Sequence, residues 1–164
     1  MEIKTDITTK SGTFKVVYRE DDSLLENDEG VYKKVVHIFA FCDGKLVIVN
    51  DGSEHWTPVG GHVESGEKYD EAAIREVKEE SNMKVLSIEF IGVQDVYEEK
   101  GICRQARYFC IVEPHGPFVS DPDGDIIEIK LIDPADYKKY FDWKIVGERL
   151  MSQVIEMLNA SQNK

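Results

Sequence analysis

Cysteine is scarce in this 164-residue sequence, where it occurs only at Cys42, Cys103 and Cys110. The number is odd and no Cys-x-x-Cys pair is present, so the pattern favours three reduced thiols over a disulfide framework or a zinc site. The first residues also lack the apolar stretch that a secretory signal needs. Together these absences predict a cytoplasmic protein.

Long apolar runs and positive charge are lacking as well. The longest apolar run, residues 35–42, is interrupted by His37 and is far too short to cross a bilayer. The chain carries 20 Lys and Arg against 32 Asp and Glu, a net charge of −12. Binding to nucleic acid or to an anionic membrane needs basic stripes, so we expect neither partner. An acidic protein can act on small phosphate esters when a cation mediates the encounter, and the excess of carboxylates therefore indicates a metal.

The apolar periodicity predicts one α/β domain over residues 1–164, because no repeat or linker divides the chain. Residues 1–30 are expected to form an extension that holds one strand, Thr13–Arg19, and an exposed acidic loop. Asp43-Gly44 between two β-rich runs predicts a two-residue hairpin turn with positive φ at both positions. The other expected elements are strands at 35–42, 45–50, 54–59, 85–96, 107–112 and 126–132, and helices at 68–81 and about 143–158. Their sum is a mixed sheet with one helix on each face.

Three carboxylates share one face of the first predicted helix, because Glu76, Glu79 and Glu80 occupy positions i, i+3 and i+4. Like charges at this spacing destabilise a helix by about 0.2–0.5 kcal/mol per pair, and a bound cation would relieve that cost. Clustered oxygen ligands suit Mg²⁺, with Mn²⁺ possible, and no His or Cys lies nearby at zinc-ligand spacing. On helix charge alone, a solvated acidic surface is the alternative interpretation.

The spacing around these carboxylates resembles the Nudix box, Gly-x5-Glu-x7-Arg-Glu-U-x-Glu-Glu-x-Gly-U, where U is aliphatic. This chain reads Gly61-x5-Glu67-x7-Arg75-Glu76-Val77-x-Glu79-Glu80-x-Asn82-Met83. The one departure is Asn82, which stands where the family has glycine. Glycine would end the helix in the left-handed conformation, and Asn is the next-best residue for that geometry.

The resemblance implies a Nudix-type α/β/α sandwich and a metal-dependent hydrolase. Such an enzyme cleaves a diphosphate linkage in a nucleoside diphosphate joined to another moiety X, here expected to be a nucleoside triphosphate or related nucleotide. It also implies that Glu76, Glu79 and Glu80 are metal ligands or the base acting on water, with a carbonyl of Gly60 or Gly61 as a further ligand. Glu67 and Arg75 would brace the loop and helix. Homodimers are common in the family, so a homodimer is possible.

Several residues outside the box are weaker candidates. Members of the family often add an acidic metal ligand from a later loop, for which Asp123 is favoured and Glu98 or Glu99 is the alternative. Further hypotheses are phosphate contacts from Arg104 and Arg107, base stacking by Trp56, Tyr97 or Tyr108, and a substrate contact from His62. For each of these residues a structural role is the more frequent one.

Two alternatives to the hydrolase stay open. One is a catalytically inactive Nudix-fold module that binds a nucleotide, which the intact carboxylate set disfavours. The other is the isopentenyl diphosphate isomerases, which have a similar fold and use a catalytic Cys with a Glu. Cys42 lies on a predicted strand among apolar neighbours, which makes it a poor candidate for that role.

Overall fold

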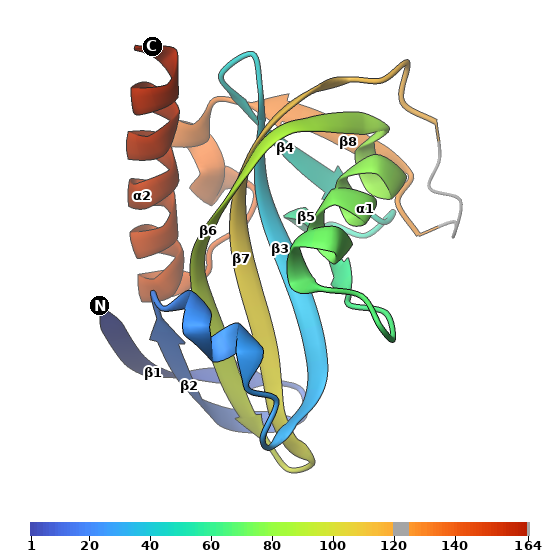
Figure 1. Ribbon diagram of the computed structural model, residues 1–164. Coiled ribbons are helices and arrows are strands. Elements are labelled where there is room, and N and C mark those ends of the chain that lie inside the picture. The colour runs from blue at the N-terminus through green and yellow to red at the C-terminus, as the bar shows by residue number, and fades with distance from the viewer. Residues whose placement is uncertain (120–124, 164) are drawn as a thin grey trace.

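A computed structural model describes residues 1–119 and 125–163, which form one mixed eight-stranded sheet flanked by two α-helices (Figure 1). The strand order is β1-β2-β6-β7-β3-β5-β4-β8, and β3 also pairs with β4. The strands are β1 (Glu2–Thr9), β2 (Gly12–Arg19), β3 (Val31–Cys42), β4 (Lys45–Asn50), β5 (Trp56–His62), β6 (Met83–Glu98), β7 (Gly101–Pro114) and β8 (Glu128–Ile132), and the helices are η1 (Asp22–Glu26), α1 (Tyr69–Ser81), η2 (Pro134–Lys139) and α2 (Lys144–Gln162).

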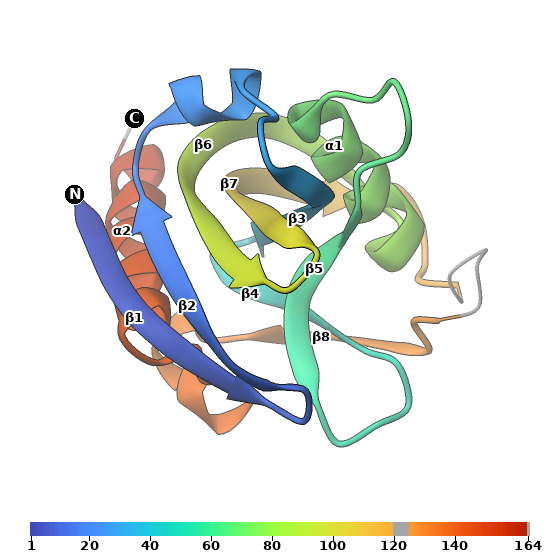
Figure 2. The same ribbon diagram turned by 90° about the horizontal axis from the view of Figure 1, so that it is seen from below.

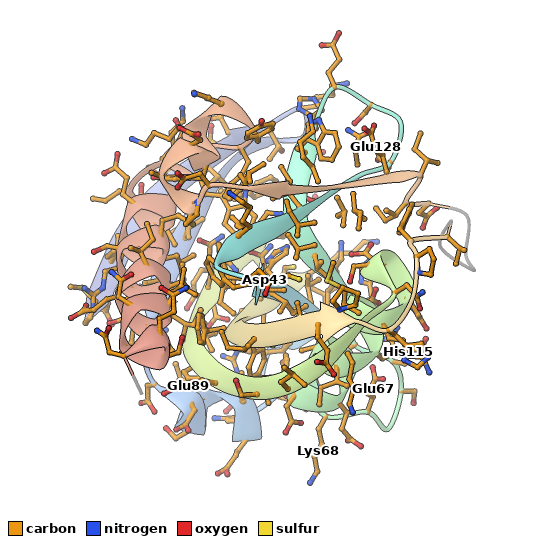
Figure 3. All side chains as sticks on the ribbon, turned by 90° about the horizontal axis from the view of Figure 1, so that it is seen from above. Asp43, Glu67, Lys68, Glu89, His115 and Glu128 are labelled. Carbon is orange, nitrogen blue, oxygen red and sulfur yellow. The ribbon has the colours of Figure 1, made fainter. Side chains whose placement is uncertain are left out.

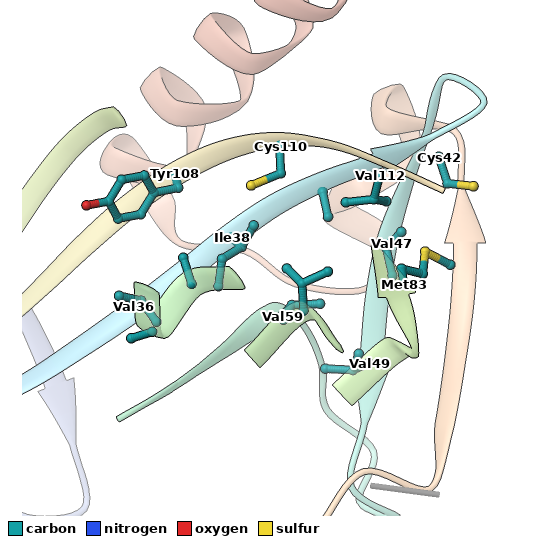
Figure 4. Close-up of a cluster of buried hydrophobic side chains, with 14 of the residues drawn as sticks. Val36, Ile38, Cys42, Val47, Val49, Val59, Met83, Tyr108, Cys110 and Val112 are labelled. Carbon is teal, nitrogen blue, oxygen red and sulfur yellow. The ribbon is translucent and has the colours of Figure 1, made fainter. Parts of the chain in front are cut away.

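The alternation of side chains along β3 divides the core into two layers. Val36, Ile38 and Ala40 pack in the cluster that contains the buried face of α1, part of which Figure 4 shows. Phe39 and Phe41 point to the opposite side and pack in the cluster that contains the buried face of α2. Because a strand turns successive residues to opposite faces, this one segment fixes both layers. The predicted sandwich, with a helix on each side of a mixed sheet, is confirmed.

The α1 helix lies close to the sheet because its inner face carries small residues. Ala72, Ala73 and Val77 are completely buried. In α2 the buried residues Val146, Leu150, Val154 and Leu158 recur at four-residue spacing, which gives one apolar stripe. The helix α1 has the predicted bounds to within one residue, whereas α2 begins where predicted but continues to Gln162, about one turn beyond the predicted end.

The N-terminal segment differs from the prediction of a single strand. Residues 2–19 form an antiparallel hairpin, β1 with β2, and β2 pairs with β6. The strand β1 contains only two apolar residues, Ile3 and Ile7, so its alternation is too weak to be recognised in the sequence. The acidic segment that follows is not wholly a loop, because it contains the 3-10 helix η1, capped by the Asp21 side chain.

Two conformational predictions are confirmed. Asp43 and Gly44 have φ of 50° and 77°, as the hairpin turn requires. Asn82 ends α1 in the left-handed region, with φ 54° and ψ 40°. All three cysteines are unpaired and buried, and within the described residues no helix is long and apolar enough to cross a membrane.

The left-handed Asn82 gives a test of how α1 ends. Alanine at this position would be strained by about 1–2 kcal/mol, and it would lose the bond from Asn82 Nδ2 to the Pro117 carbonyl at 2.8 Å. We therefore expect Asn82→Ala to lower the free energy of unfolding by about 1–2 kcal/mol in urea titrations. Asn82→Gly loses the bond but not the backbone fit, and it should stay within about 1 kcal/mol of wild type. Equal losses in both variants would mean that the side-chain bond, not the backbone, ends the helix.

Candidate active site

The site is built where β5 leaves the sheet and the chain turns into α1. Residues 63–68 make the connection, and Gly66 has a φ of 81°, which favours glycine. Glu67 closes this turn twice: its backbone N–H donates to the Glu64 carbonyl and its Oε1 accepts from Glu64 N, both at 3.0 Å. The Glu71 carboxylate then accepts from Lys68 N at 3.0 Å and caps the first turn of α1.

Arg75 connects the loop, the strand and the helix. Its guanidinium binds Glu67 with two bonds, Nε to Oε2 at 2.7 Å and Nη2 to Oε1 at 2.9 Å. Nη2 also donates to the His62 carbonyl at 2.9 Å, at the end of β5. Nη1 donates to Glu76 Oε1 at 2.8 Å and to Glu79 Oε2 at 3.1 Å. These contacts lower the pKa of Glu67 and raise that of Arg75, and one cation offsets part of the repulsion among the helix carboxylates.

The two glycines at the end of β5 lie directly against the acidic face of α1. A Cβ placed on Gly61 would overlap the Glu76 carboxylate, so a larger residue there would displace this side chain. Gly60 N donates to Glu80 Oε1 at 2.8 Å, and Glu80 is only 8% exposed. Two carboxylates of α1 thus meet the backbone of β5 at adjacent residues.

The donor set fits a hard divalent cation, since carboxylate and main-chain carbonyl oxygens are the ligands that Mg²⁺ and Mn²⁺ prefer. Within residues 1–119 and 125–163, however, no three His, Cys, Asp or Glu side chains are arranged as a metal cluster. Arg75 holds Glu76 and Glu79 instead. Metal binding would therefore draw carboxylates away from a guanidinium, an exchange of one cation for another of higher charge.

The candidate residues outside the box are not gathered at the acidic face of α1. Asp123 lies outside the described residues. Glu98 and Glu99 lie at the turn between β6 and β7, at the lower end of the sheet in Figure 1 and away from the acidic face of α1. Tyr97 lies near the same end of β6, where the Lys15 ammonium lies over its ring. Trp56 packs edge-on against Tyr140.

Arg104 does not serve as a phosphate contact in this arrangement. It is buried, binds Asp95 at 2.9 and 3.0 Å, and donates to the carbonyls of Leu24 and Asn27. These bonds hold η1 against the sheet. Arg107 is also buried, but it lies on the opposite face of β7 and contacts His37 and Gln105. The sequence reasoning did not connect Arg107 with His37 and Gln105. The available signal was that these polar residues interrupt otherwise apolar strands.

A cavity of about 700 Å³ adjoins the loop side of the site. Its walls come from η1, β3, α1, β6 and β7, and its lining includes Lys34, Glu67, Tyr69, Phe90 and Tyr108. Figure 3 shows Glu67 and Lys68 together below α1, away from Asp43 and Glu128 on other loops. Tyr108 is therefore placed beside the site, as a wall of this cavity.

Comparisons with known proteins show what the chain is similar to. The family model described as NUDIX domain matches residues 31–153. YtkD of Bacillus subtilis (strain 168), provisionally named an 8-oxo-dGTP diphosphatase, is 29% identical over 102 residues, which are 61% of this chain and 65% of that protein. The asymmetrical bis(5'-nucleosyl)-tetraphosphatase of Mus musculus is 41% identical over 69 residues, 42% of each chain. The alignments thus span less than two thirds of the lengths of these relatives.

The fold is also similar to solved structures. A mutant of the Bacillus subtilis pyrophosphohydrolase BsRppH superposes with a TM-score of 0.62 at 22% identity, over 79% of this chain and 77% of that chain. At this identity the likeness concerns the arrangement of strands and helices.

The Glu67–Arg75 pair gives a pH-dependent prediction. Because the folded-state pKa of Glu67 is lowered, the pair adds stability that is fully present above the usual carboxyl pKa of about 4.3 and is lost as the pH falls through the lowered value. We expect Glu67→Gln to cost about 1–2 kcal/mol at pH 7, and this difference should shrink below about pH 4. Denaturant titrations from pH 3 to 7 would measure it.

Glu64→Gln is the matched control. The Glu64 side chain is 67% exposed and lies 3.8 Å from Arg75 Nη1, so its loss should change stability very little. If Glu67→Gln lowers the free energy of unfolding by the same amount at every pH, the electrostatic account is contradicted, and the loss comes from changed side-chain packing.

Proposed function

The chain belongs to the NUDIX family, and on that premise we propose that it is a divalent-metal-dependent hydrolase of nucleotides. The reaction is cleavage of a diphosphate linkage in a nucleoside diphosphate joined to another moiety, with a nucleoside triphosphate or related nucleotide as substrate. The observation that carries the proposal is the meeting of Glu76 and Glu80 with the Gly60-Gly61 backbone at the end of β5. The two curated relatives are both named for nucleotides with phosphoanhydride chains, which supports this substrate class.

The carboxylates of Glu76, Glu79 and Glu80, with a carbonyl of Gly60 or Gly61, would hold the metal. When bound, Mg²⁺ or Mn²⁺ supplies neutralisation of phosphate oxygens and a lower pKa for the attacking water. One of these three carboxylates would instead act as the base and take the proton of the attacking water as its oxygen bonds to phosphorus, and the bridging P–O bond would break with its electron pair left on the departing phosphate oxygen. Asp123 is proposed as an additional ligand.

Glu67 and Arg75 are proposed to position this machinery. The two bonds of Glu67 to Arg75 fix the guanidinium, which in turn sets where Glu76 and Glu79 lie. Productive geometry in such sites depends on shifts of less than an ångström, so support at this level affects the rate. The partners are small nucleotides, and a cytoplasmic location and a homodimer complete the proposal.

One observation favours a second candidate, a nucleotide-binding module without catalysis. Arg75 holds Glu76 and Glu79, so the described residues contain no preformed metal cluster. If metal cannot displace this guanidinium, the site binds nucleotide and leaves it intact. Activity with Mg²⁺ or Mn²⁺ separates the two candidates.

The test is hydrolysis of a panel of nucleoside triphosphates, nucleotide sugars, ADP-ribose and dinucleoside polyphosphates, with Mg²⁺, Mn²⁺ or a chelator, and products identified by chromatography. We expect turnover of one class with metal and none with chelator. Glu80→Gln should lower kcat by at least about 100-fold, because it removes a charged ligand. It keeps an oxygen that accepts from Gly60 N, so the variant should stay folded.

Glu71→Gln is the control on the same helix, because Glu71 is exposed and its carboxylate accepts from Lys68 N at the start of α1. It should retain wild-type kcat and the same rise in melting temperature with Mg²⁺, which Glu80→Gln should lose. Folded wild-type protein that binds nucleotides equally well with chelator and never cleaves them would overturn the hydrolase in favour of the binding module.

A further inference from the structure

The cavity of about 700 Å³ beside residues 63–68 has features that the proposed hydrolysis does not use. It lies on the α1 side of the sheet, because its floor contains Ile88, Phe90 and Tyr108, which belong to or pack against the core cluster under α1. Its sides come from η1 and from the start of α1, and Figure 2 shows these two helices next to each other. A cavity of this volume is large enough for a small molecule.

The Tyr108 hydroxyl is a polar group in the lining of this cavity. Tyr108 is only 5% exposed, and none of the described residues forms a hydrogen bond with its Oη. Figure 4 shows the ring directed away from Cys110, and the Phe90 ring meets it edge-on with the ring centroids 6.0 Å apart. A buried hydroxyl without a hydrogen bond destabilises the fold, so a ligand that bonds to Oη would offset this cost.

Carboxylates approach this hydroxyl from two walls of the cavity. Asp70 lies in the first turn of α1 and Asp22 begins η1, and both line the cavity. Burial raises the pKa of Tyr108, and these two carboxylates are among the groups that raise it further, so they lie within electrostatic reach of the phenol. An anion would be repelled from Oη, whereas a cation that donates to Oη would be attracted.

The charged residues that line the cavity leave an excess of carboxylates. Lys34 pairs with Asp28, and Glu67 pairs with Arg75. The remaining charged groups of the lining form no ion pair within residues 1–119 and 125–163, and they are the carboxylates of Asp22, Glu26 and Asp70 and the ammonium of Lys68. Three negative charges therefore oppose one positive charge, which favours a positively charged ligand.

The cavity also offers apolar and aromatic surface to a ligand. Leu25 of η1 and Ile88 and Phe90 of β6 are only half-buried, so part of their surface is open to the cavity. Aromatic rings prefer edge-to-face or offset contacts with one another, and their faces attract cations. A molecule that joins an ammonium group to an aromatic ring therefore matches both the charge and the floor of the cavity.

We propose that this cavity is a second ligand site, which takes a small protonated amine that carries an aromatic ring. The ammonium group donates to Tyr108 Oη between the Asp22 and Asp70 carboxylates, and the ring lies against Phe90. The site is separate from the acidic face of α1, because Glu76, Glu79 and Glu80 do not line this cavity. It goes beyond the proposed hydrolysis and does not depend on it, since binding can be measured without turnover.

The first experiment is calorimetric titration of the full chain at pH 7, with a chelator present and four probes that differ in charge or in the ring. The probes are 2-phenylethylamine, 2-phenylethanol, 3-phenylpropionate and butylamine. We expect 2-phenylethylamine to bind at least about 10-fold more tightly than 2-phenylethanol, in which a neutral hydroxyl replaces the ammonium group. Butylamine, which has no ring, should bind more weakly than 2-phenylethylamine, and 3-phenylpropionate should not bind. Equal affinities for the amine and the alcohol would overturn the inference.

The second experiment repeats the titration with variants of the lining. Tyr108→Phe removes only the hydroxyl and should weaken the binding of 2-phenylethylamine about 10-fold. Asp70→Asn keeps the Oδ1 that accepts from Glu71 N and should weaken binding about 3-fold or more. The matched controls are Tyr137→Phe and Asp43→Asn, because neither residue lines the cavity. Both controls should bind the amine as the wild type does.

The melting temperature of Tyr108→Phe should equal that of the wild type, because within the described part of the chain the hydroxyl has no hydrogen bond to lose. A clear fall would show that the hydroxyl is bonded within the fold and would overturn the inference. Amine binding that is unchanged in Tyr108→Phe, or that is lost in Glu80→Gln instead, would place the amine elsewhere and would also overturn it. Tyr108-dependent amine binding by a protein that hydrolyses no nucleotide supports the second site and overturns the proposed function alone.

Discussion

The arrangement of the candidate site depends on Arg75. One guanidinium binds Glu67 in the loop, the His62 carbonyl at the end of β5, and Glu76 and Glu79 on α1. Without it, three carboxylates on one helix face and a fourth in the loop would repel each other in a chain of net charge −12. The same contacts stabilise the fold and keep the acidic cluster together, so the structure is held by the groups that a metal would have to reorganise.

The strand β5 lies in close contact with both the acidic helix α1 and the neighbouring strand β3. Gly61 has no side chain between β5 and the Glu76 side chain of α1. Gly60 has none between β5 and the His37 ring on the neighbouring strand β3. The close approach also explains Ala72 and Ala73 on the inner face of α1, where larger residues would push the helix away. The glycines and alanines at these positions thus follow from how closely α1 approaches β5.

Much of the fold and of the candidate site could be predicted from the sequence, because the residues that determine them act through local backbone conformation and spacing. The turn at Asp43-Gly44 and the helix end at Asn82 depend on backbone conformations that few residues adopt, and both are found. The strand β1 could not be recognised, because its stability comes from pairing with β2 rather than from its own apolar residues. Which carboxylates Arg75 binds is equally hidden, since helix spacing shows which charges are near each other but not which ion pairs form.

Arg104 and Arg107 illustrate the same limit and what the structure adds. They are three residues apart on β7, so they point to opposite faces of the sheet, and the sequence treats them alike. Arg104 meets Asp95 from β6 and two carbonyls near η1, which satisfy its charge and its donors. Among the described residues, Arg107 donates to two neutral partners, His37 and Gln105, and lies against the Trp143 ring. A buried charge without an opposite charge beside it raises the free energy of the folded state unless hydrogen bonds offset the cost, so Arg107 depends on these two acceptors. The two arginines are thus alike in the sequence and differ in the partners that the fold brings to them.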